Sequence, residues 1–242
     1  MSGHNPAGWL DPLTERDPLT RPVPPVGEVC LGDLKRTEPI SRKFGGDRGT
    51  PVDRYYIENF LETHARDIRG RVLEIGENVY TRRFGGHRVT QSDILDAPAS
   101  DNERATIVAD LASCPEVRGG RFDCIILTQT LHMIYDVKGV LASVERLLAP
   151  GGTLLATVPC ISQIDAGSTR DSWFWYMTPR CARLFFEERF PGEQIDITPY
   201  GNVLAATAFL HGLALEEMDR SDMDVCDPQY PVITGVRATK SM

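Results

Sequence analysis

The chain has 242 residues, with 26 Lys and Arg against 34 Asp and Glu, a formal net charge of -8 and a pI near 5.2. This length suits one large α/β domain with an extension, and the acidic balance argues against nucleic acid as a partner because nucleic-acid binders display basic stripes. No stretch reaches the roughly 18 apolar residues that a membrane span needs, so we expect a cytoplasmic protein that does not enter a membrane.

The N-terminal part of the chain differs in composition from the rest. Residues 1–49 are rich in proline, glycine and charge, so we expect an irregular arm with little core of its own, followed by an α/β domain over residues 50–242. The first helix is predicted to start with Thr50 as its cap, Pro51 in its first position and Asp53 closing a capping box. Gly70 ends this helical run.

Short β-rich runs then alternate with helical runs, which is the pattern of a parallel sheet covered on both faces. Strands are predicted at residues 71–75, 88–90, 105–109, 122–128, 153–158, 194–198 and 232–239. Helices are predicted at 137–148, 178–190 and 202–218, with a long loop over 160–177. The sequence therefore predicts a doubly wound, mostly parallel, seven-stranded Rossmann-like sheet.

Candidate ligand-binding residues, several of them polar, stand at the ends of the predicted strands, where nucleotide-type ligands bind on such sheets. They are Glu74 and Gly76, Ser92 and Asp93, Asp110 and Leu111, and Thr128 and Gln129. Asp93 lies 17 residues beyond Gly76. This is close to the roughly 20-residue offset at which an acidic side chain meets a ribose diol. The alternative for Asp110 is to cap the turn that follows it.

Several of these segments resemble the class I S-adenosylmethionine-dependent methyltransferases. The resemblance is carried by Arg71–Gly76, Asp93, residues 109–111, residues 122–131 and residues 147–154. It covers about residues 51–240 and implies the methyltransferase version of the Rossmann-like fold, with S-adenosylmethionine as cofactor. A narrower resemblance, over residues 44–56 and 200–212, is to bacterial methyltransferases associated with glycosyltransferases and secondary metabolism.

The first loop departs from that family's acidic-x-Gly-x-Gly-x-Gly pattern. Gly76 is followed by Glu77-Asn78-Val79-Tyr80-Thr81, with no second glycine until Gly85. Because glycine lets a backbone approach a ligand closely, this loop must pass the methionine end of the cofactor differently. The same absence argues against a dinucleotide, whose pyrophosphate needs a glycine-lined helix start. It also leaves open a cyclase, or a scaffold that binds the cofactor without transferring methyl.

The resemblance implies a set of cofactor-binding residues. They are Tyr55, Glu74, Gly76, Asn78, Asp93, Asp110, Leu111, Thr128 and Gln129. We expect Thr128 and Gln129 to contribute backbone atoms. Arg48 and Arg54 are candidates for binding the cofactor carboxylate, with a solvated helix face as the alternative.

His132 is the candidate catalytic residue because it follows the fourth strand closely, where relatives place acceptor-side groups. An ordinary pKa near 6.5 would let His132 act as a base at neutral pH. Relatives carry histidine one position later, at Met133 here, and a packed, structural His132 is the alternative. Trp173 and Tyr176 are predicted to form an acceptor wall, or else to anchor their loop to the core.

These observations predict methyl transfer to a small molecule, at a hydroxyl of a sugar or natural product. The sulfonium is already activated, so the protein chiefly aligns the nucleophile with the methyl group. We expect the N-terminal arm and the aromatic loop to close over the acceptor. No metal-ligand spacing is present in the sequence, and a homo-oligomer remains open.

Overall fold

The computed structural model describes residues 23–165, 167 and 170–242, and it divides the chain into two units, Met1–Thr37 and Glu38–Met242. In the described part of the smaller unit, a turn joins the Glu28 N–H to the Pro25 carbonyl, and a short 3-10 helix, η1 (Gly32–Leu34), follows. The start of the predicted arm, residues 1–22, lies outside the described residues. The proposed lid role of the arm therefore stays a prediction.

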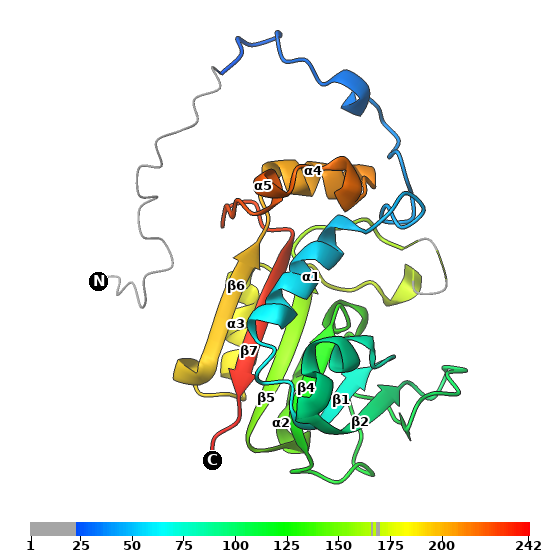
Figure 1. The fold of residues 1–242 in the computed structure, drawn as a ribbon, viewed down its shortest axis with the longest axis vertical. Coiled ribbons are helices and arrows are strands. Elements are labelled where there is room, and N and C mark those ends of the chain that lie inside the picture. The colour runs from blue at the N-terminus through cyan, green and yellow to red at the C-terminus, as the bar shows by residue number, and fades with distance from the viewer. Residues whose placement is uncertain (1–22, 166, 168–169) are drawn as a thin grey trace. The chain divides into compact units, whose positions relative to one another are not determined.

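The larger unit is built on one seven-stranded sheet with the order β3-β2-β1-β4-β5-β7-β6 (Figure 1). The strands are β1 (Gly70–Ile75), β2 (Val89–Asp96), β3 (Ile107–Val108), β4 (Phe122–Thr128), β5 (Leu148–Pro159), β6 (Ile195–Tyr200) and β7 (Ile233–Thr239). Strands β1 to β5 pair in parallel, and β7 is antiparallel to both β5 and β6. The predicted doubly wound, mostly parallel sheet is confirmed, and the strand order reverses between β1 and β4.

Side chains of the central strands alternate between two hydrophobic cores, because helices cover both faces of the sheet. In β4, Ile125 and Leu127 join the core formed with α2 (Val137–Leu147) and α3 (Pro179–Glu187). Cys124 and Ile126 join the opposite core, with α1 (Val52–Thr63) and α4 (Val203–His211). Figure 1 shows α1 in front of the strands and α3 behind them.

Three helices begin at a residue whose side chain accepts the backbone N–H three positions further on. Asp136 caps α2 in this way, Thr178 caps α3 and Asn202 caps α4. These caps satisfy N–H groups that a helix start leaves without intrahelical partners.

The start of α1 differs from the prediction. Pro51 precedes the first helical residue, and no side chain caps this end. Thr50 is not the cap, because its backbone N–H and its hydroxyl both donate to the Glu216 carboxylate, at 2.8 and 2.7 Å. A tertiary contact with the turn η7 (Leu215–Glu217) has replaced the local one.

Residues 38–49, which the sequence analysis assigns to the arm, belong to the larger unit. The N–H groups of Ile40 and Ser41 donate to the His211 carbonyl at the end of α4, at 2.8 and 3.1 Å. Arg48 forms an ion pair with Glu217. These contacts place Lys43 and Phe44 beside the domain core.

Several elements differ in extent from the sequence prediction, among them β5, which begins at Leu148 instead of residue 153. β2 continues six residues beyond Thr90, to Asp96. The predicted helix 202–218 is interrupted because Gly212 adopts a φ of +68°, which ends α4. Residues 79–88 form successive helical turns, including η2 (Thr81–Gly85) and η3 (Gly86–Arg88), where no element was predicted.

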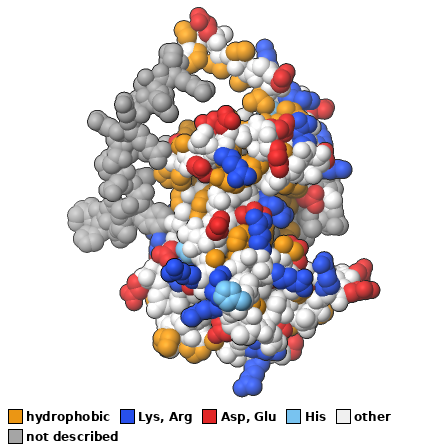
Figure 2. Space-filling model, in the orientation of Figure 1, with side chains coloured by type: hydrophobic (Ala, Val, Ile, Leu, Met, Phe, Trp, Pro, Cys, Tyr) orange, Lys and Arg blue, Asp and Glu red, His pale blue; other side chains and the backbone are white. Residues whose placement is uncertain are grey.

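The remaining α-helix of the described residues is α5 (Arg220–Met223). In the described part of the chain, no helix combines the length and apolar character needed to cross a bilayer. On the face drawn in Figure 2, acidic and basic side chains are interspersed.

Candidate functional site

A cleft of about 620 Å³ opens where β1, β2 and β4 end. We call it the strand-end cleft. It is lined by Ile75, Gly76, Glu77, Leu95, Asp96, Ala97, Arg104, Ala109, Asp110, Leu111, Thr128, Gln129, Thr130, Met133, Ile134 and Ser172. Parallel pairing brings these residues together, because the carboxyl ends of parallel strands meet at one edge of the sheet.

A second cavity of about 380 Å³ lies between this edge and α1, and we call it the aromatic cavity. It is lined by Lys43, Phe44, Pro51, Asp53, Arg54, Ile57, Glu74, Ile75, Glu77, Tyr80, Thr128, Gln129, His132, Met133, Pro159, Ser162, Trp173, Phe209 and Ile233. Five residues line both spaces: Ile75, Glu77, Thr128, Gln129 and Met133. The two spaces are therefore neighbours that share a wall.

Asp96 is the acidic residue at the true end of β2. It lies 20 residues beyond Gly76 and lines the strand-end cleft. Its carboxylate accepts the Ala97 N–H at 2.8 Å and the Asn102 Nδ2 at 2.8 Å, and Asn102 also donates to the Gly76 carbonyl at 2.7 Å. Asn102 thus ties the end of β2 to the loop after β1.

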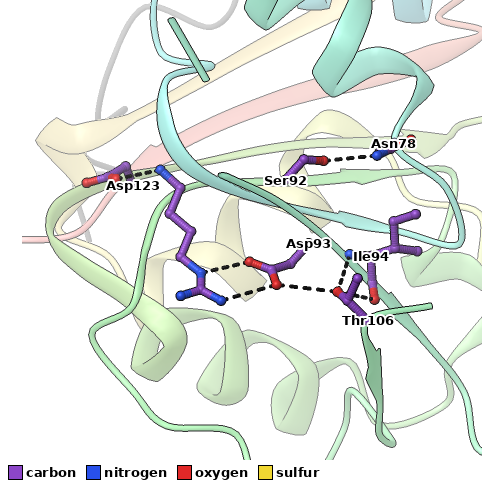
Figure 3. A network of polar contacts seen from close by, with 7 residues as sticks. Asn78, Ser92, Asp93, Ile94, Thr106 and Asp123 are labelled. Carbon is purple, nitrogen blue, oxygen red and sulfur yellow. Dashed lines mark hydrogen bonds and ion pairs between the residues drawn. The ribbon is translucent and has the colours of Figure 1, made fainter. Parts of the chain in front are cut away.

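The placement of Asp93 corrects the sequence analysis. Asp93 is buried inside β2, opposite Leu73, three residues before the strand ends, and it lines neither cavity. Its carboxylate accepts two hydrogen bonds from the Arg71 guanidinium, from Nε at 2.7 Å and from Nη2 at 3.1 Å. Figure 3 shows this pair beside Thr106. Asp93 therefore links β2 to β1 through an ion pair. The prediction that it ends a strand is wrong because β2 continues to Asp96.

Glu74 holds the glycine-poor loop. Its buried carboxylate accepts the backbone N–H groups of Tyr80 at 3.2 Å and Thr81 at 2.7 Å, at the start of the helical turns that follow β1. Burial raises the pKa of the Glu74 carboxyl, and the two donated N–H groups oppose this shift. A carboxylate anchor therefore fixes the loop that follows β1.

Gln129 and Phe44 share an unusual backbone conformation. They are the two non-glycine residues with positive φ in the described ranges, at 45° and 57°, and both line the aromatic cavity. Such strain costs roughly 1–3 kcal/mol and concentrates at functional sites. The Gln129 amide nitrogen is also buried without a hydrogen-bond partner among the described residues. Packing of β4 alone therefore does not account for the conformation of Gln129 at the end of this strand.

His132 is buried at 3% exposure on the short turn η4 (Leu131–Met133) and lines the aromatic cavity. Neither ring nitrogen has a partner among the described residues. Its ring centroid lies 4.4 Å from that of Trp173. Burial lowers the pKa of His132 to about 4, so the imidazole is neutral at pH 7 and is a weaker base than the ordinary value suggests.

The other predicted site residues divide into two groups. Glu74, Gly76, Asp110, Leu111, Thr128, Gln129, His132 and Trp173 line one or both cavities. Tyr55, Asn78 and Tyr176 line neither. The Tyr55 hydroxyl donates to Asp224, Asn78 donates to the Ser92 hydroxyl at 3.1 Å, and the Tyr176 hydroxyl donates to the Ser162 carbonyl at 3.1 Å.

Asp96, Asp53 and Lys43 are among the lining residues that the sequence did not indicate. Asp96 carried a usable signal, because its offset of 20 residues from Gly76 fits the ribose rule better than that of Asp93. Asp53 was interpreted as part of a helix start, yet it lines the aromatic cavity. Lys43 was assigned to the arm, and no local pattern indicates that it returns to the sheet edge.

Comparison with known proteins decides the family. A model described as a methyltransferase domain matches residues 44–191, more than half of the chain. The chain belongs to this methyltransferase family. No curated protein matches its sequence significantly.

Solved structures share the fold of this methyltransferase domain at low sequence identity. A SAM dependent methyltransferase from Archaeoglobus fulgidus is 11% identical with a TM-score of 0.52, over 77% of this chain and 94% of that one. A possible exported protein from Bordetella parapertussis is 11% identical with a TM-score of 0.52, over 89% and 75%. The [4+2]-cyclase SpnF is 16% identical with a TM-score of 0.50, over 81% and 85%. At these identities the likeness establishes the architecture.

Membership of the family makes S-adenosylmethionine the cofactor. The strand-end cleft fits such a molecule. Gly76 has a φ of +78°, and a Cβ added there would meet no atom within 4 Å, so the cleft is open where the loop leaves β1. The Asp96 carboxylate, which can accept from ribose hydroxyls, stands at the same end of the sheet. No cluster of three or more metal-ligating side chains occurs in the described ranges.

The different positions of Asp93 and Asp96 generate a first prediction. Asp93→Asn leaves the Arg71 charge without its partner, so the free energy of unfolding should fall by about 2 kcal/mol while the Kd for S-adenosylhomocysteine changes less than about threefold. Asp96→Asn should weaken that binding about ten- to a hundredfold and cost less than about 1 kcal/mol of stability. Urea unfolding and calorimetry measure both. An Asp93→Asn protein of normal stability that no longer binds would restore Asp93 as the ribose ligand.

Burial of His132 predicts a pH-dependent stability. The folded pKa of about 4 lies below the unfolded value of about 6.5, so the unfolded chain binds more protons between these values. The free energy of unfolding should therefore fall as the pH drops from about 6.5 to about 4, by up to about 3 kcal/mol from this residue. His132→Gln should lose that part of the slope in urea unfolding, whereas substitution of the exposed His87 by Gln should keep it. Identical slopes in wild type and His132→Gln would contradict the assignment.

Proposed function

We propose that this protein transfers the methyl group of S-adenosylmethionine to a hydroxyl of a small molecule, such as a sugar or a natural product, bound in the aromatic cavity. The supporting observation is the wall that the two cavities share. A donor in the strand-end cleft and an acceptor in the aromatic cavity would meet across Thr128, Gln129 and Met133. Bound S-adenosylmethionine supplies a methyl group already activated on a sulfonium.

Orientation is the main contribution expected of the chain. In this proposal Asp96 accepts from the ribose hydroxyls, Asn102 keeps that carboxylate in place, and Asp110 with the Leu111 backbone faces the adenine. These residues line the cleft or hold one another by the hydrogen bonds described above. Tyr55 and Asn78 have no part in it because they bond elsewhere.

Arg54 is the proposed partner of the cofactor carboxylate. It lines the aromatic cavity next to the shared wall, and its guanidinium lies 6.0 Å from the Tyr80 ring centroid. The second candidate, Arg48, is paired with Glu217 instead. An arginine fork matches a carboxylate with two parallel hydrogen bonds.

The acceptor side combines flat rings with neutral hydrogen-bonding groups. The Phe44 and Trp173 rings are stacked, with centroids 6.1 Å apart and an interplanar angle of 15°, and His132 lies against Trp173. Such faces suit a sugar or aryl ring. The unpartnered His132 ring would hydrogen-bond the acceptor, while Tyr176 lies outside this wall. A cytoplasmic location and the oligomeric state stay predictions.

The Arg54 assignment is tested by two ligands that differ in the amino-acid part. Arg54→Gln should weaken S-adenosylhomocysteine about tenfold, because one charged hydrogen-bonding partner is lost, and should leave 5′-methylthioadenosine unchanged, since that ligand has no carboxylate. Calorimetry measures both constants. Arg83→Gln is the matched control, because Arg83 pairs with Glu58 and lines neither cavity. Equal weakening of both ligands would contradict the assignment.

Methyl transfer itself is tested by incubating the protein and S-adenosylmethionine with panels of hydroxylated sugars, nucleotide sugars and phenols. We expect S-adenosylhomocysteine and a product heavier by one methylene, detected by mass spectrometry. Trp173→Ala should raise the KM for that acceptor about tenfold and leave the cofactor Kd within about threefold. The reason is that Trp173 lines the aromatic cavity but not the strand-end cleft. Tight cofactor binding without any methylated product would favour the alternative, a cyclase or a non-catalytic binding protein.

A further inference from the structure

The aromatic cavity contains a carboxylate that the mechanism above does not use. Asp53 stands in the first turn of α1 and lines this cavity, but it does not line the strand-end cleft. It therefore faces the proposed acceptor space without reaching the adenosine end of the site. No hydrogen bond or ion pair joins Asp53 to another side chain among the described residues, but the backbone N–H groups of Asp53 and Arg54 hydrogen-bond to its carboxylate.

Charged and titratable groups face this cavity from every element around it. They are Arg54 of α1, Lys43 of the preceding segment, Glu74 of β1, Glu77 and Tyr80 after β1, and His132 of η4. Three of them are in a defined state in this structure. Glu74 accepts two backbone N–H groups, Arg54 lies near the Tyr80 ring, and His132 is uncharged at pH 7. Of the three carboxylates, Glu74 is held by backbone N–H groups and Glu77 lies on the wall shared with the strand-end cleft, whereas Asp53 lines the aromatic cavity and not the cleft.

A helix N-terminus alone would explain an acidic residue at this position, because negative charge there is favourable. Two further observations point to a ligand. His132, which lines the same cavity and is only 3% exposed, has two buried ring nitrogens without a partner among the described residues, and the strained Gln129 has a buried amide nitrogen without one. Buried polar groups are normally satisfied, so this cavity is prepared for a polar molecule.

We infer that Asp53 is the group that takes the proton from the acceptor hydroxyl, with His132 as a neutral hydrogen-bonding partner of the same oxygen. The inference rests on the proposed function. In the step, the hydroxyl proton passes to the Asp53 carboxylate, and an oxygen lone pair forms the bond to the methyl carbon. The electron pair of the broken carbon–sulfur bond stays on sulfur, which becomes a neutral thioether. Charge and atoms balance without a further reactant.

The two candidate bases differ in how their surroundings change them. Burial raises the pKa of the Asp53 carboxyl to about 6, opposed by the Arg54 N–H and charge, and burial lowers the pKa of His132 to about 4. A base works best when its pKa lies near the working pH. Asp53 is ionised above about pH 6 and has the greater affinity for a proton, which favours it over His132.

The test uses sinefungin, in which a carbon bearing a primary amine replaces the methylated sulfur. Its ammonium occupies the place of the transferred methyl group, so an ionised carboxylate on the acceptor side should favour sinefungin over S-adenosylhomocysteine. The preference for sinefungin is the Kd for S-adenosylhomocysteine divided by the Kd for sinefungin. For wild type, this ratio should fall about tenfold between pH 7.5 and pH 5. Asp53→Asn should show the low ratio at both pH values, and Asp53→Glu should restore part of the preference.

Carboxyl ¹³C NMR adds a readout that a helix-stabilising role would not change. The Asp53 signal should titrate near pH 6 with S-adenosylhomocysteine bound and at a lower pH with sinefungin bound. Glu62→Gln, an exposed acidic residue of the same helix, is the control and should keep the wild-type ratio. The inference would be overturned by a Kd ratio that Asp53→Asn leaves unchanged, or by an Asp53 signal that titrates at the same pH with either ligand bound. Failure of the proposed function looks different, because wild type would bind both ligands and methylate no acceptor.

Discussion

The parallel pairing of β1 with β2 on one side and with β4 on the other is the constraint on which the whole site depends. Because the three strands run in one direction, Ile75, Asp96 and Thr128 end at the same edge of the sheet, although they are distant in the chain. No connection can close that edge where the strand order reverses, so a space remains there. The strand-end cleft is a consequence of topology, and its chemistry follows from which residues happen to end the strands.

The two carboxylates of β2 have different roles because they occupy different positions along the strand. Asp93 and Asp96 are three residues apart, but Asp93 lies alongside Leu73 within the sheet and is neutralised by Arg71, whereas Asp96 passes the end of β1 and reaches the cleft. An unpaired carboxylate inside a sheet would be costly to desolvate. The ion pair removes that cost and lets β2 continue through a polar stretch.

Burial shifts the pKa values of the groups in the aromatic cavity in opposite directions. Burial disfavours charge, so the pKa of a carboxyl such as Asp53 rises and the pKa of an imidazole such as His132 falls. The loop after β1 shows the complementary solution. Glu74 is kept beside two backbone N–H groups, and this contact fixes the turn.

The sequence by itself determined the sheet, its helices and the edge at which the site lies, because alternating β-rich and helical runs, caps and strand-end residues such as Glu74, Thr128 and Gln129 are local signals. It could not determine where β2 ends, since Ser92 and Asp93 look like a turn until Arg71 is brought beside them by pairing. The directions of Tyr55 and Asn78 were likewise decided by distant partners, Asp224 and Ser92. Membership of Asp53 and Lys43 in the cavity, and the neutrality of His132, arise from packing of segments far apart in the chain. Tertiary structure alone supplies those neighbours.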